Sequence, residues 1–334
     1  MLKRLVAGAV ILGAVAGGVW WWHEGRAPVP SRSFEFDYVA RIPAGEKGAL
    51  RVWIPVPESD AYQEISDLRI ESPVAYELHR DPEYRNQYAY LEVAPETARQ
   101  SIEVRLRFRV TRREHKVNVN GGSVHASAAA ASPTELERWL QPDRLVPLDG
   151  MIGALAEQET RGLTRPLDKA RAVYDYVVST MRYDKTGEGW GRGDAIYACT
   201  ARQGNCTDFH ALFIGMMRSS GIPARFEIGF PLPAGQTAGE IPGYHCWAEF
   251  YLEDIGWIPV DASEAWKNPE KRDYFFGAHD EHRVLFTRGR DIRFNPAQAG
   301  DPLNYFIYPY AELDGKPFAG VESQSSFRDL PASR

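Results

Sequence analysis

The spacing of apolar residues along this chain changes once, near Pro133. Before that point, apolar and polar residues alternate in four short stretches, at residues 34–38, 50–54, 88–93 and 102–108. A period of two is typical of strands with one buried face, and turn-rich segments separate these stretches. The pattern predicts an antiparallel β-sandwich over residues 33–115, without residues of obvious chemical function.

After Pro133 the apolar spacing becomes three and four, as in amphipathic helices, first at residues 134–140 and then at 167–181. The strongest helix signal follows Gly204. Asn205 is a suitable N-cap, and Asp208 lies at the third helical position, where a carboxylate favours both the cap and the helix dipole. The predicted buried stripe of this helix contains Phe209, Leu212, Phe213, Met216 and Met217.

Gly221 and Pro223 are expected to end this helix. Strands are predicted beyond it at residues 224–229, 245–252 and 257–260. A helix laid against an antiparallel sheet, preceded by a sandwich, indicates an α+β protein.

Cys206 is the first residue of the predicted helix. Unpaired N–H groups and the positive end of the dipole at a helix start stabilise a thiolate relative to a thiol. The backbone N–H of Cys206 is also a candidate donor to a developing oxyanion. Gln203 and Trp190, in the preceding loop, are candidates for a second donor, although a structural role is favoured for both.

His245 begins a predicted strand in which successive residues face opposite sides. Cys246 would lie on the apolar face and serve packing, whereas His245 would point away from it. If residues 253–255 form the turn, Asp261 lies diagonally beside His245 on the neighbouring strand. A two-residue turn would move Asp261 to the other face, so this geometry depends on loop length. A thiol, an imidazole and a carboxylate so placed are the minimal apparatus of thioester chemistry.

Four blocks of this sequence resemble, in order and spacing, the core of the transglutaminase-like superfamily, which has a papain-like fold. These blocks are residues 204–210, 221–225, 244–249 and 256–261. The preceding sandwich also resembles the β-domain that often comes before such cores in bacterial members. Carried over residue by residue, the resemblance implies the catalytic triad Cys206, His245 and Asp261, the same three positions that the residues alone suggested.

The resemblance implies acyl transfer from peptide or isopeptide amides through a cysteine thioester. Animal cross-linking members have Trp after the nucleophile, whereas this chain has Thr207, and no acidic cluster suggests a calcium switch. We therefore expect hydrolysis of a peptide or protein substrate, with no cofactor. One alternative is an amine-dependent transglutaminase; another, of a different class, is a non-catalytic binding or scaffolding module at the cell envelope.

The other cysteines and histidines support less specific interpretations. Three cysteines leave at least one thiol free in a monomer. The sequence does not decide whether Cys199 and Cys246 form a disulfide. A zinc site built from Cys206, His210, His245 and Cys246 is not favoured, because adjacent strand residues point to opposite faces. We expect no metal, and we expect His210 on the surface of its helix.

Several residues near the C-terminus are expected to have no specific role. His279 and His282 are expected to bind nothing. Solvent exposure is favoured for three polar residues: Arg288, Arg290 and Asp291.

The first residues indicate a membrane-directed segment. Lys3 and Arg4 precede the uncharged run of residues 5–22. Small residues at 14–16 resemble a signal cleavage site, whereas the length of the run and the tryptophans at 20–22 favour a retained anchor. We favour an anchor in the inner membrane, with the rest of the chain periplasmic or otherwise extracytoplasmic.

These patterns predict an order of segments along the chain: a signal or anchor with its linker (1–32), the sandwich (33–115), a connection (116–132), the catalytic core (133–267) and a C-terminal extension packed on the core (268–334). A nucleic-acid partner is not expected, because the net charge is -6, with 39 Lys and Arg against 45 Asp and Glu.

Overall fold

The computed structural model describes residues 28–44, 48–95, 97, 100–119 and 131–331. The predicted anchor at residues 5–22 lies outside these residues, as does most of the predicted connection. Within the described ranges, no helix has the length and apolar character needed to cross a membrane.

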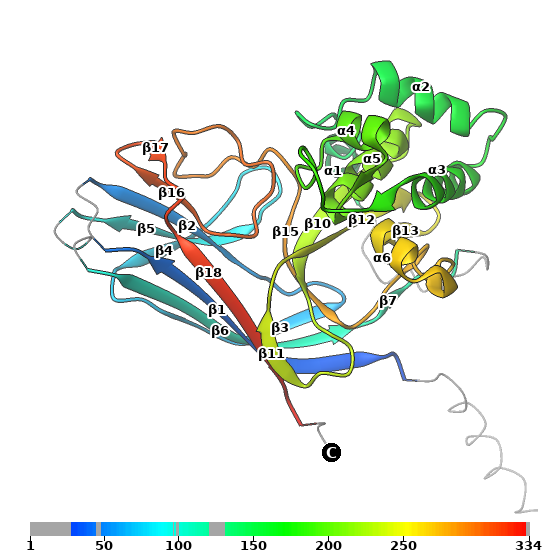
Figure 1. Cartoon of the computed structure of the whole chain (residues 1–334). Coiled ribbons are helices and arrows are strands. Elements are labelled where there is room, and N and C mark those ends of the chain that lie inside the picture. The colour runs from blue at the N-terminus through cyan, green and yellow to red at the C-terminus, as the bar shows by residue number, and fades with distance from the viewer. Residues whose placement is uncertain (1–27, 45–47, 96, 98–99, 120–130, 332–334) are drawn as a thin grey trace, which may run out of the picture.

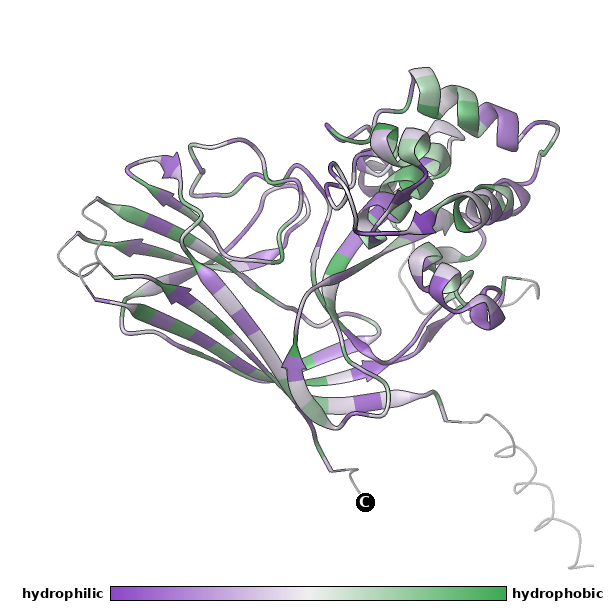
Figure 2. Cartoon of the chain, in the orientation of Figure 1, coloured by the Kyte–Doolittle hydropathy of each residue, from purple (hydrophilic) through white to green (hydrophobic). Residues whose placement is uncertain are grey.

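Two five-stranded antiparallel sheets form the sandwich, on the left of Figure 1. One sheet has the order β11 (Ala238–Ile241), β18 (Glu322–Asp329), β1 (Ser31–Ile42), β6 (Ile102–Arg113) and β3 (Gln63–Glu71). The other has the order β17 (Lys316–Pro317), β16 (Tyr310–Leu313), β2 (Leu50–Val56), β5 (Gln87–Val93) and β4 (Tyr76–Arg80). Hydrophobic and hydrophilic residues alternate along these strands, as Figure 2 shows, so each sheet buries one face. The four predicted strands are confirmed, whereas β3 and β4 were not predicted.

The sandwich takes strands from distant parts of the chain. Strand β18 pairs with β1, and β16 pairs with β2. Residues 268–334, expected to pack on the core, therefore divide: β15 (Arg283–Arg288) joins the core sheet, and β16, β17 and β18 join the sandwich. An unpaired strand edge exposes backbone donors and acceptors, which explains why late strands add to β1 and β2.

The core contains a four-stranded sheet in the order β13 (Gly256–Val260), β12 (His245–Leu252), β10 (Ala224–Pro231) and β15. Helix α5 (Cys206–Ser219) packs against β12 and β10, and four helices also contact it: α2 (Gly150–Glu159), α3 (Pro166–Thr180), α4 (Ala195–Ala201) and α6 (Ala262–Lys267). The chain also contains α1 (Pro133–Arg138) and the short 3₁₀ turn η3 (Pro269–Lys271). The predicted α+β fold class, with a papain-like core after a sandwich, is confirmed.

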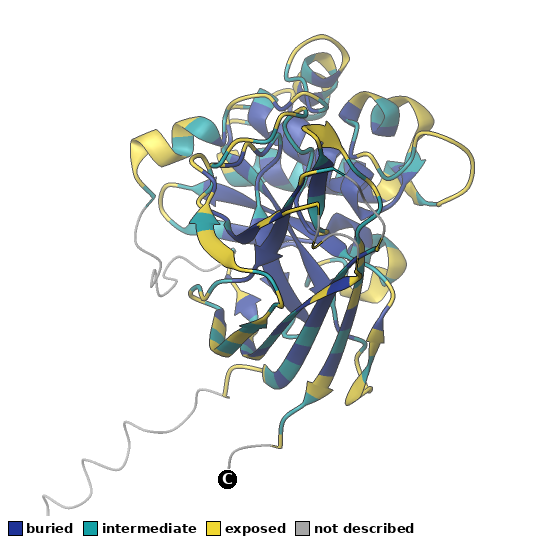
Figure 3. Ribbon diagram, turned by 90° about the vertical axis from the view of Figure 1, so that its left-hand side faces the viewer, coloured by how far each residue is buried: buried dark blue, intermediate teal, exposed yellow. Residues whose placement is uncertain are grey.

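Helix α5 is buried on all sides and not only along the predicted stripe. Every residue of α5 except Ser219 is buried. Figure 3 shows buried residues concentrated at the centre of the core, with exposed residues on the outer helices. A helix hydrophobic enough to be enclosed provides a rigid support for the residue at its start.

Two pairs of very short strands complete the fold. Strand β7 (His115–Lys116) pairs with β14 (Ala278–His279), and β8 (Arg182–Tyr183) pairs in parallel with β9 (Gln203–Gly204). Because β7 follows β6 almost directly, it carries the chain from the sandwich to the core sheet.

Candidate active site

The start of α5 is a capping box that holds Cys206 at the first helical position. The Asn205 side chain accepts a hydrogen bond from the Thr207 N–H at 2.9 Å, and the Asp208 carboxylate accepts one from the Asn205 N–H at 2.9 Å. The predicted N-cap and the role of Asp208 are confirmed. Cys206 is 2% exposed, so its sulfur lies just below the surface.

Asp208 also holds the glycine-rich loop that precedes Cys206. Its carboxylate accepts hydrogen bonds from the N–H groups of Gly191 at 2.7 Å and Gly193 at 3.0 Å. Burial raises the pKa of Asp208, although these N–H groups favour the charged form. A Cβ atom at Gly204 would collide with this carboxylate, which explains a glycine just before the cap.

Arg290 supports the same loop from the other side. Its guanidinium donates to the carbonyl oxygens of Gly193 at 2.7 Å and Arg192 at 3.1 Å. Arg290 is buried, so the prediction that it lies in solvent was wrong. Nothing in the local sequence indicates a partner about a hundred residues away.

The strand register places His245 and Asp261 together. Residues 253–255 form the turn, Leu252 pairs with Gly256, and Ala248 pairs with Val260. This three-residue turn confirms the predicted register. Nε2 of His245 lies 2.7 Å from Oδ2 of Asp261, so Nδ1 is the ring nitrogen left for Cys206.

Asp261 is fully buried and fully hydrogen bonded. It is the N-cap of α6, and its Oδ1 accepts from the Glu264 N–H at 3.0 Å and from the Ser263 hydroxyl at 3.1 Å. Nη1 of Arg283 donates to Oδ2 at 3.1 Å. Burial opposes ionisation, but His245 and then Arg283 outweigh it and hold the pKa of Asp261 well below its usual range.

The charges of Cys206 and His245 are coupled. Burial raises the pKa of the Cys206 thiol, but hydrogen bonds from Cys246 and His245 outweigh burial and bring that pKa well below its ordinary value. Burial likewise lowers the pKa of His245, but Asp261 and a hydrogen bond to Cys206 raise it to about 10. A thiolate facing an imidazolium is therefore the favoured charge state near neutral pH.

His210 lies beside this pair, contrary to the sequence prediction. Cys246 is buried, which agrees with its predicted packing role, and its sulfur lies 3.8 Å from Nδ1 of His210. Nδ1 of His210 lies 2.8 Å from the carbonyl oxygen of Cys206, and Nε2 accepts the Ala262 N–H at 3.1 Å. His210 is completely buried, so its predicted place on the helix surface was wrong.

These contacts determine the tautomer of His210. Since Nε2 accepts a backbone N–H, the proton of the neutral ring must lie on Nδ1, which donates to Cys206. Burial lowers the pKa of His210, which keeps it neutral. His210 thus connects the first turn of α5 to the first residue of α6.

Three tyrosines that the sequence analysis did not single out lie close to the Cys206 sulfur. Rings of Tyr305 and Tyr308 contact the ring of Tyr244, and the Tyr244 hydroxyl accepts from the Asn205 amide at 3.2 Å. Burial, and after it the negative charge of Cys206, raises the pKa of Tyr244 well above its usual value. A neutral phenol beside the sulfur is a hydrogen-bond donor. The one sequence feature that could have pointed to Tyr244 was its position next to His245.

The two predicted candidates for the second oxyanion donor have weaker support. The side-chain oxygen Oε1 of Gln203 accepts from Arg182 at 2.9 Å, at an exposed position. Trp190 is half-buried in the glycine-rich loop. All three cysteines are free thiols, so the structure holds no bond between Cys199 and Cys246.

Comparison with known proteins assigns the core. Residues 153–262 match the family model of the Transglutaminase-like superfamily, and this match includes Cys206, His245 and Asp261. This segment belongs to the transglutaminase-like superfamily. The transglutaminase-like core thus contains helix α5 and the strands β12 and β13.

Relatives extend the similarity beyond this core. An uncharacterized protein of Haemophilus influenzae is 26% identical over 318 residues, covering 85% of this chain and 86% of the relative. Uncharacterized protein YebA of Bacillus subtilis is 27% identical over 148 residues, which are 40% of this chain and 20% of YebA. A solved structure from Cytophaga hutchinsonii, titled "Putative Cysteine Protease", has a TM-score of 0.60 at 17% identity and covers 90% of this chain and 92% of that chain. The transglutaminase-like core and the sandwich therefore occur together in that fold.

Proposed function

We propose that this protein is a cysteine-dependent acyl-transfer enzyme in which Cys206 is the nucleophile, His245 the acid and base, and Asp261 the residue that orients His245. The observation that carries the proposal is the contact of His245 with the buried Asp261, whose facing atoms lie 2.7 Å apart, on strand β12 and at the start of α6, which both pack against the helix that begins at Cys206. The pKa of Cys206 lies well below its ordinary value and that of His245 is raised to about 10. A thiolate and a proton donor are thus both available near neutral pH, as acylation requires.

In the first half-reaction the Cys206 thiolate attacks the carbonyl carbon of an amide. The resulting oxyanion would accept from the backbone N–H of Cys206, which has no intrahelical acceptor at the first helical position. We propose the Tyr244 hydroxyl as the second donor, because it contacts the side chain of Asn205, the residue before Cys206. The His245 imidazolium then gives its proton to the departing amine, which leaves a thioester on Cys206 and a neutral imidazole.

In the second half-reaction an acceptor attacks the thioester. If the acceptor is water, His245 takes its proton, the carboxylic acid is released, and the thiolate and imidazolium are restored. If a primary amine attacks instead, the product is a new amide. Water is the default acceptor in an aqueous site, so we propose hydrolysis of peptide or isopeptide amides.

Access to the sulfur depends on the residues around it. Cys206 is 2% exposed and His245 is 6% exposed. The Tyr305 hydroxyl donates to the Gly191 carbonyl oxygen at 3.2 Å, which joins the tyrosines to the glycine-rich loop. We propose that substrate binding separates Tyr305 from the loop and widens the access to the sulfur.

The proposed location is extracytoplasmic, with anchoring in the inner membrane through residues 5–22. This part of the proposal depends on the uncharged run that follows Lys3 and Arg4 in the sequence. A peptide or protein substrate at the cell envelope is consistent with it.

Covalent labelling tests the proposal. The full-length chain in detergent is treated with an iodoacetamide-type probe at about pH 7, where a free thiol of ordinary pKa is mostly unreactive. We expect rapid labelling of the native chain and equally rapid labelling of the matched control Cys199→Ala. The rapid labelling should be absent from Cys206→Ala. Fast labelling of Cys206→Ala would contradict the assignment of the nucleophile.

Product analysis separates the possible functions. A peptide library is incubated with the enzyme, with and without a tagged primary amine, and analysed by mass spectrometry. New carboxyl ends that require Cys206 support hydrolysis, whereas incorporation of the tag supports amine-dependent transfer. A labelled Cys206 without turnover of any peptide would favour a binding module.

A further inference from the structure

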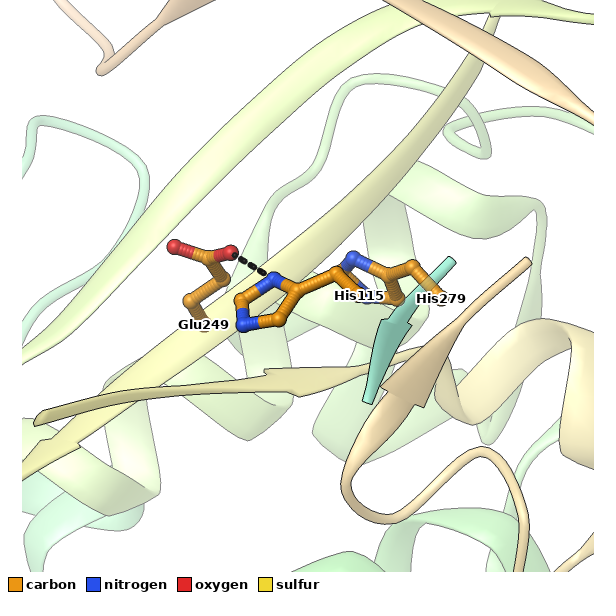
Figure 4. A group of neighbouring side chains, drawn as sticks. All are labelled: His115, Glu249 and His279. Carbon is orange, nitrogen blue, oxygen red and sulfur yellow. Dashed lines mark ion pairs between the residues drawn. The ribbon is translucent and has the colours of Figure 1, made fainter. Parts of the chain in front are cut away.

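A second group of buried ionisable side chains lies on the strand that carries His245. Glu249 of β12 meets His115 of β7 and His279 of β14, and one ligand atom from each lies within 4.8 Å of those of the other two. His115 and His279 face each other as a pair in the β7–β14 ladder. Figure 4 shows the three side chains converging from these strands. We call this group the His115 cluster.

The imidazoles of the His115 cluster lack hydrogen-bond partners. His115 is 2% exposed and His279 is 0% exposed, yet among the described residues neither ring nitrogen of either histidine has a partner. Nδ1 of His115 lies 3.1 Å from Oε1 of Glu249, but the contact lacks hydrogen-bond geometry. A buried polar group without a partner costs about 1–3 kcal/mol, so four such nitrogens require an explanation.

The two carboxylate oxygens of Glu249 have different neighbours. Arg225 bonds to Oε2 of Glu249, which leaves Oε1 directed to the histidines.

We propose that His115, Glu249 and His279 bind one divalent transition-metal ion of the zinc type. Two imidazoles and a carboxylate are a common zinc ligand set, and imidazole donors favour zinc over magnesium or calcium. Metal-ligand bonds of about 2.0–2.1 Å place tetrahedral ligand atoms about 3.3 Å apart, so small side-chain movements suffice. Such an ion would satisfy one nitrogen of each histidine.

The surrounding charges do not exclude a cation. Arg225 and Arg283 lie near the His115 cluster and oppose positive charge, but each is paired with carboxylates.

The position of the ligands indicates a structural role. His115 follows the last long strand of the sandwich, His279 precedes β15, and Glu249 lies four residues after His245. The ion would join the sandwich to the core sheet behind the catalytic histidine. Because all three ligands are buried, a substrate has no direct approach to the ion.

Metal analysis of the full-length chain in detergent tests the proposal. All proteins carry Cys206→Ala, so that the Cys206 thiolate cannot bind the metal. Zinc binding is then measured in an inactive protein, so the result does not depend on whether the proposed enzymatic function is right. After treatment with a chelator, each protein is dialysed against Zn²⁺, and bound zinc is measured by mass spectrometry. We expect one zinc per chain, a loss of at least about 10-fold in affinity in His279→Asn, and full binding in the exposed control His79→Asn. Stoichiometric zinc binding by His279→Asn would overturn the proposal.

Two further measurements do not depend on the folding of the variant. Zn²⁺ at about 100 times its Kd should raise the Tm of the chelated parent protein by about 5 °C. Co²⁺ should give the visible absorption of a tetrahedral site with nitrogen and oxygen ligands, without a sulfur charge-transfer band. An unchanged Tm, or binding of no metal by the parent protein, would overturn the proposal.

Discussion

Strand β12 carries two buried histidine-carboxylate clusters whose completeness differs. Around Cys206, His245 bonds to Asp261 and both ring nitrogens of His210 have partners. Four residues further along β12, Glu249 faces His115 and His279, whose ring nitrogens make no hydrogen bond within the described part of the chain. Burial is nearly complete in both clusters. The difference teaches that equal burial can accompany different hydrogen bonding: the protein itself pairs the histidines of the first cluster, whereas the second cluster suits the metal ion proposed above.

The largest effect is expected from removing the carboxylate of the Cys206 cluster. Asp261→Asn keeps the shape and the α6 cap but cannot stabilise the imidazolium, so we expect kcat/KM to fall by about 10⁴-fold. Zinc binding should be unchanged if the clusters are independent. The control is Glu264→Gln, whose carboxylate lies 4.0 Å from Nε2 of His245. A fall in the Asp261→Asn activity no greater than that of the control would contradict the assigned role.

The two clusters should also differ in how much a histidine contributes to the stability of the fold. His210→Ala leaves the Cys206 carbonyl and the Ala262 N–H unpaired in the interior, which should cost about 2–4 kcal/mol of unfolding free energy. His279→Ala in the metal-free protein removes no hydrogen bond, so its cost should be smaller. Urea unfolding measures both, and His210→Gln, which can donate and accept, should recover part of the loss. Equal costs for the two alanine variants would break the comparison.

A smaller effect is expected at Tyr244. If its hydroxyl stabilises the oxyanion, Tyr244→Phe should lower kcat by about 10²-fold, while alkylation of Cys206, which forms no oxyanion, should keep its rate. The surface variant Tyr76→Phe serves as the control. Loss of alkylation together with turnover would assign Tyr244 to thiolate stabilisation instead.

The smallest effect is expected from pH between about 6 and 8, where turnover should be nearly flat. The lowered pKa of Cys206 keeps the thiolate present well below the usual range of a thiol, and activity is lost only when acid protonates it. The raised pKa of His245 keeps its proton until the pH passes about 10, where the leaving amine loses its acid. The pH profile of kcat/KM checks both limits. An alkaline limit near the ordinary pKa of histidine would contradict the coupling.

Local patterns were sufficient to predict the nucleophile helix and its cap. Asn205 and Asp208 satisfy donors within three residues of themselves, so their role is visible in the sequence. The proximity of His245 and Asp261 followed from strand alternation and one turn length, since a three-residue turn determines the register. Contacts between residues that do not belong to the same helix turn or hairpin could not be predicted in this way. The predicted positions of Arg290 and His210 were therefore wrong.

The sequence by itself determined the class of fold, the helix that presents Cys206 and the strand register that brings His245 to Asp261, because each depends on periodicity or capping over a few neighbouring residues. Only the tertiary structure decided that β18 completes the sandwich, that His210 lies buried between Cys206 and Ala262, and that His115 meets His279. These contacts join residues far apart in the chain. Their energies come from burial and from hydrogen bonds that exist only after the chain has folded, so no local pattern encodes them.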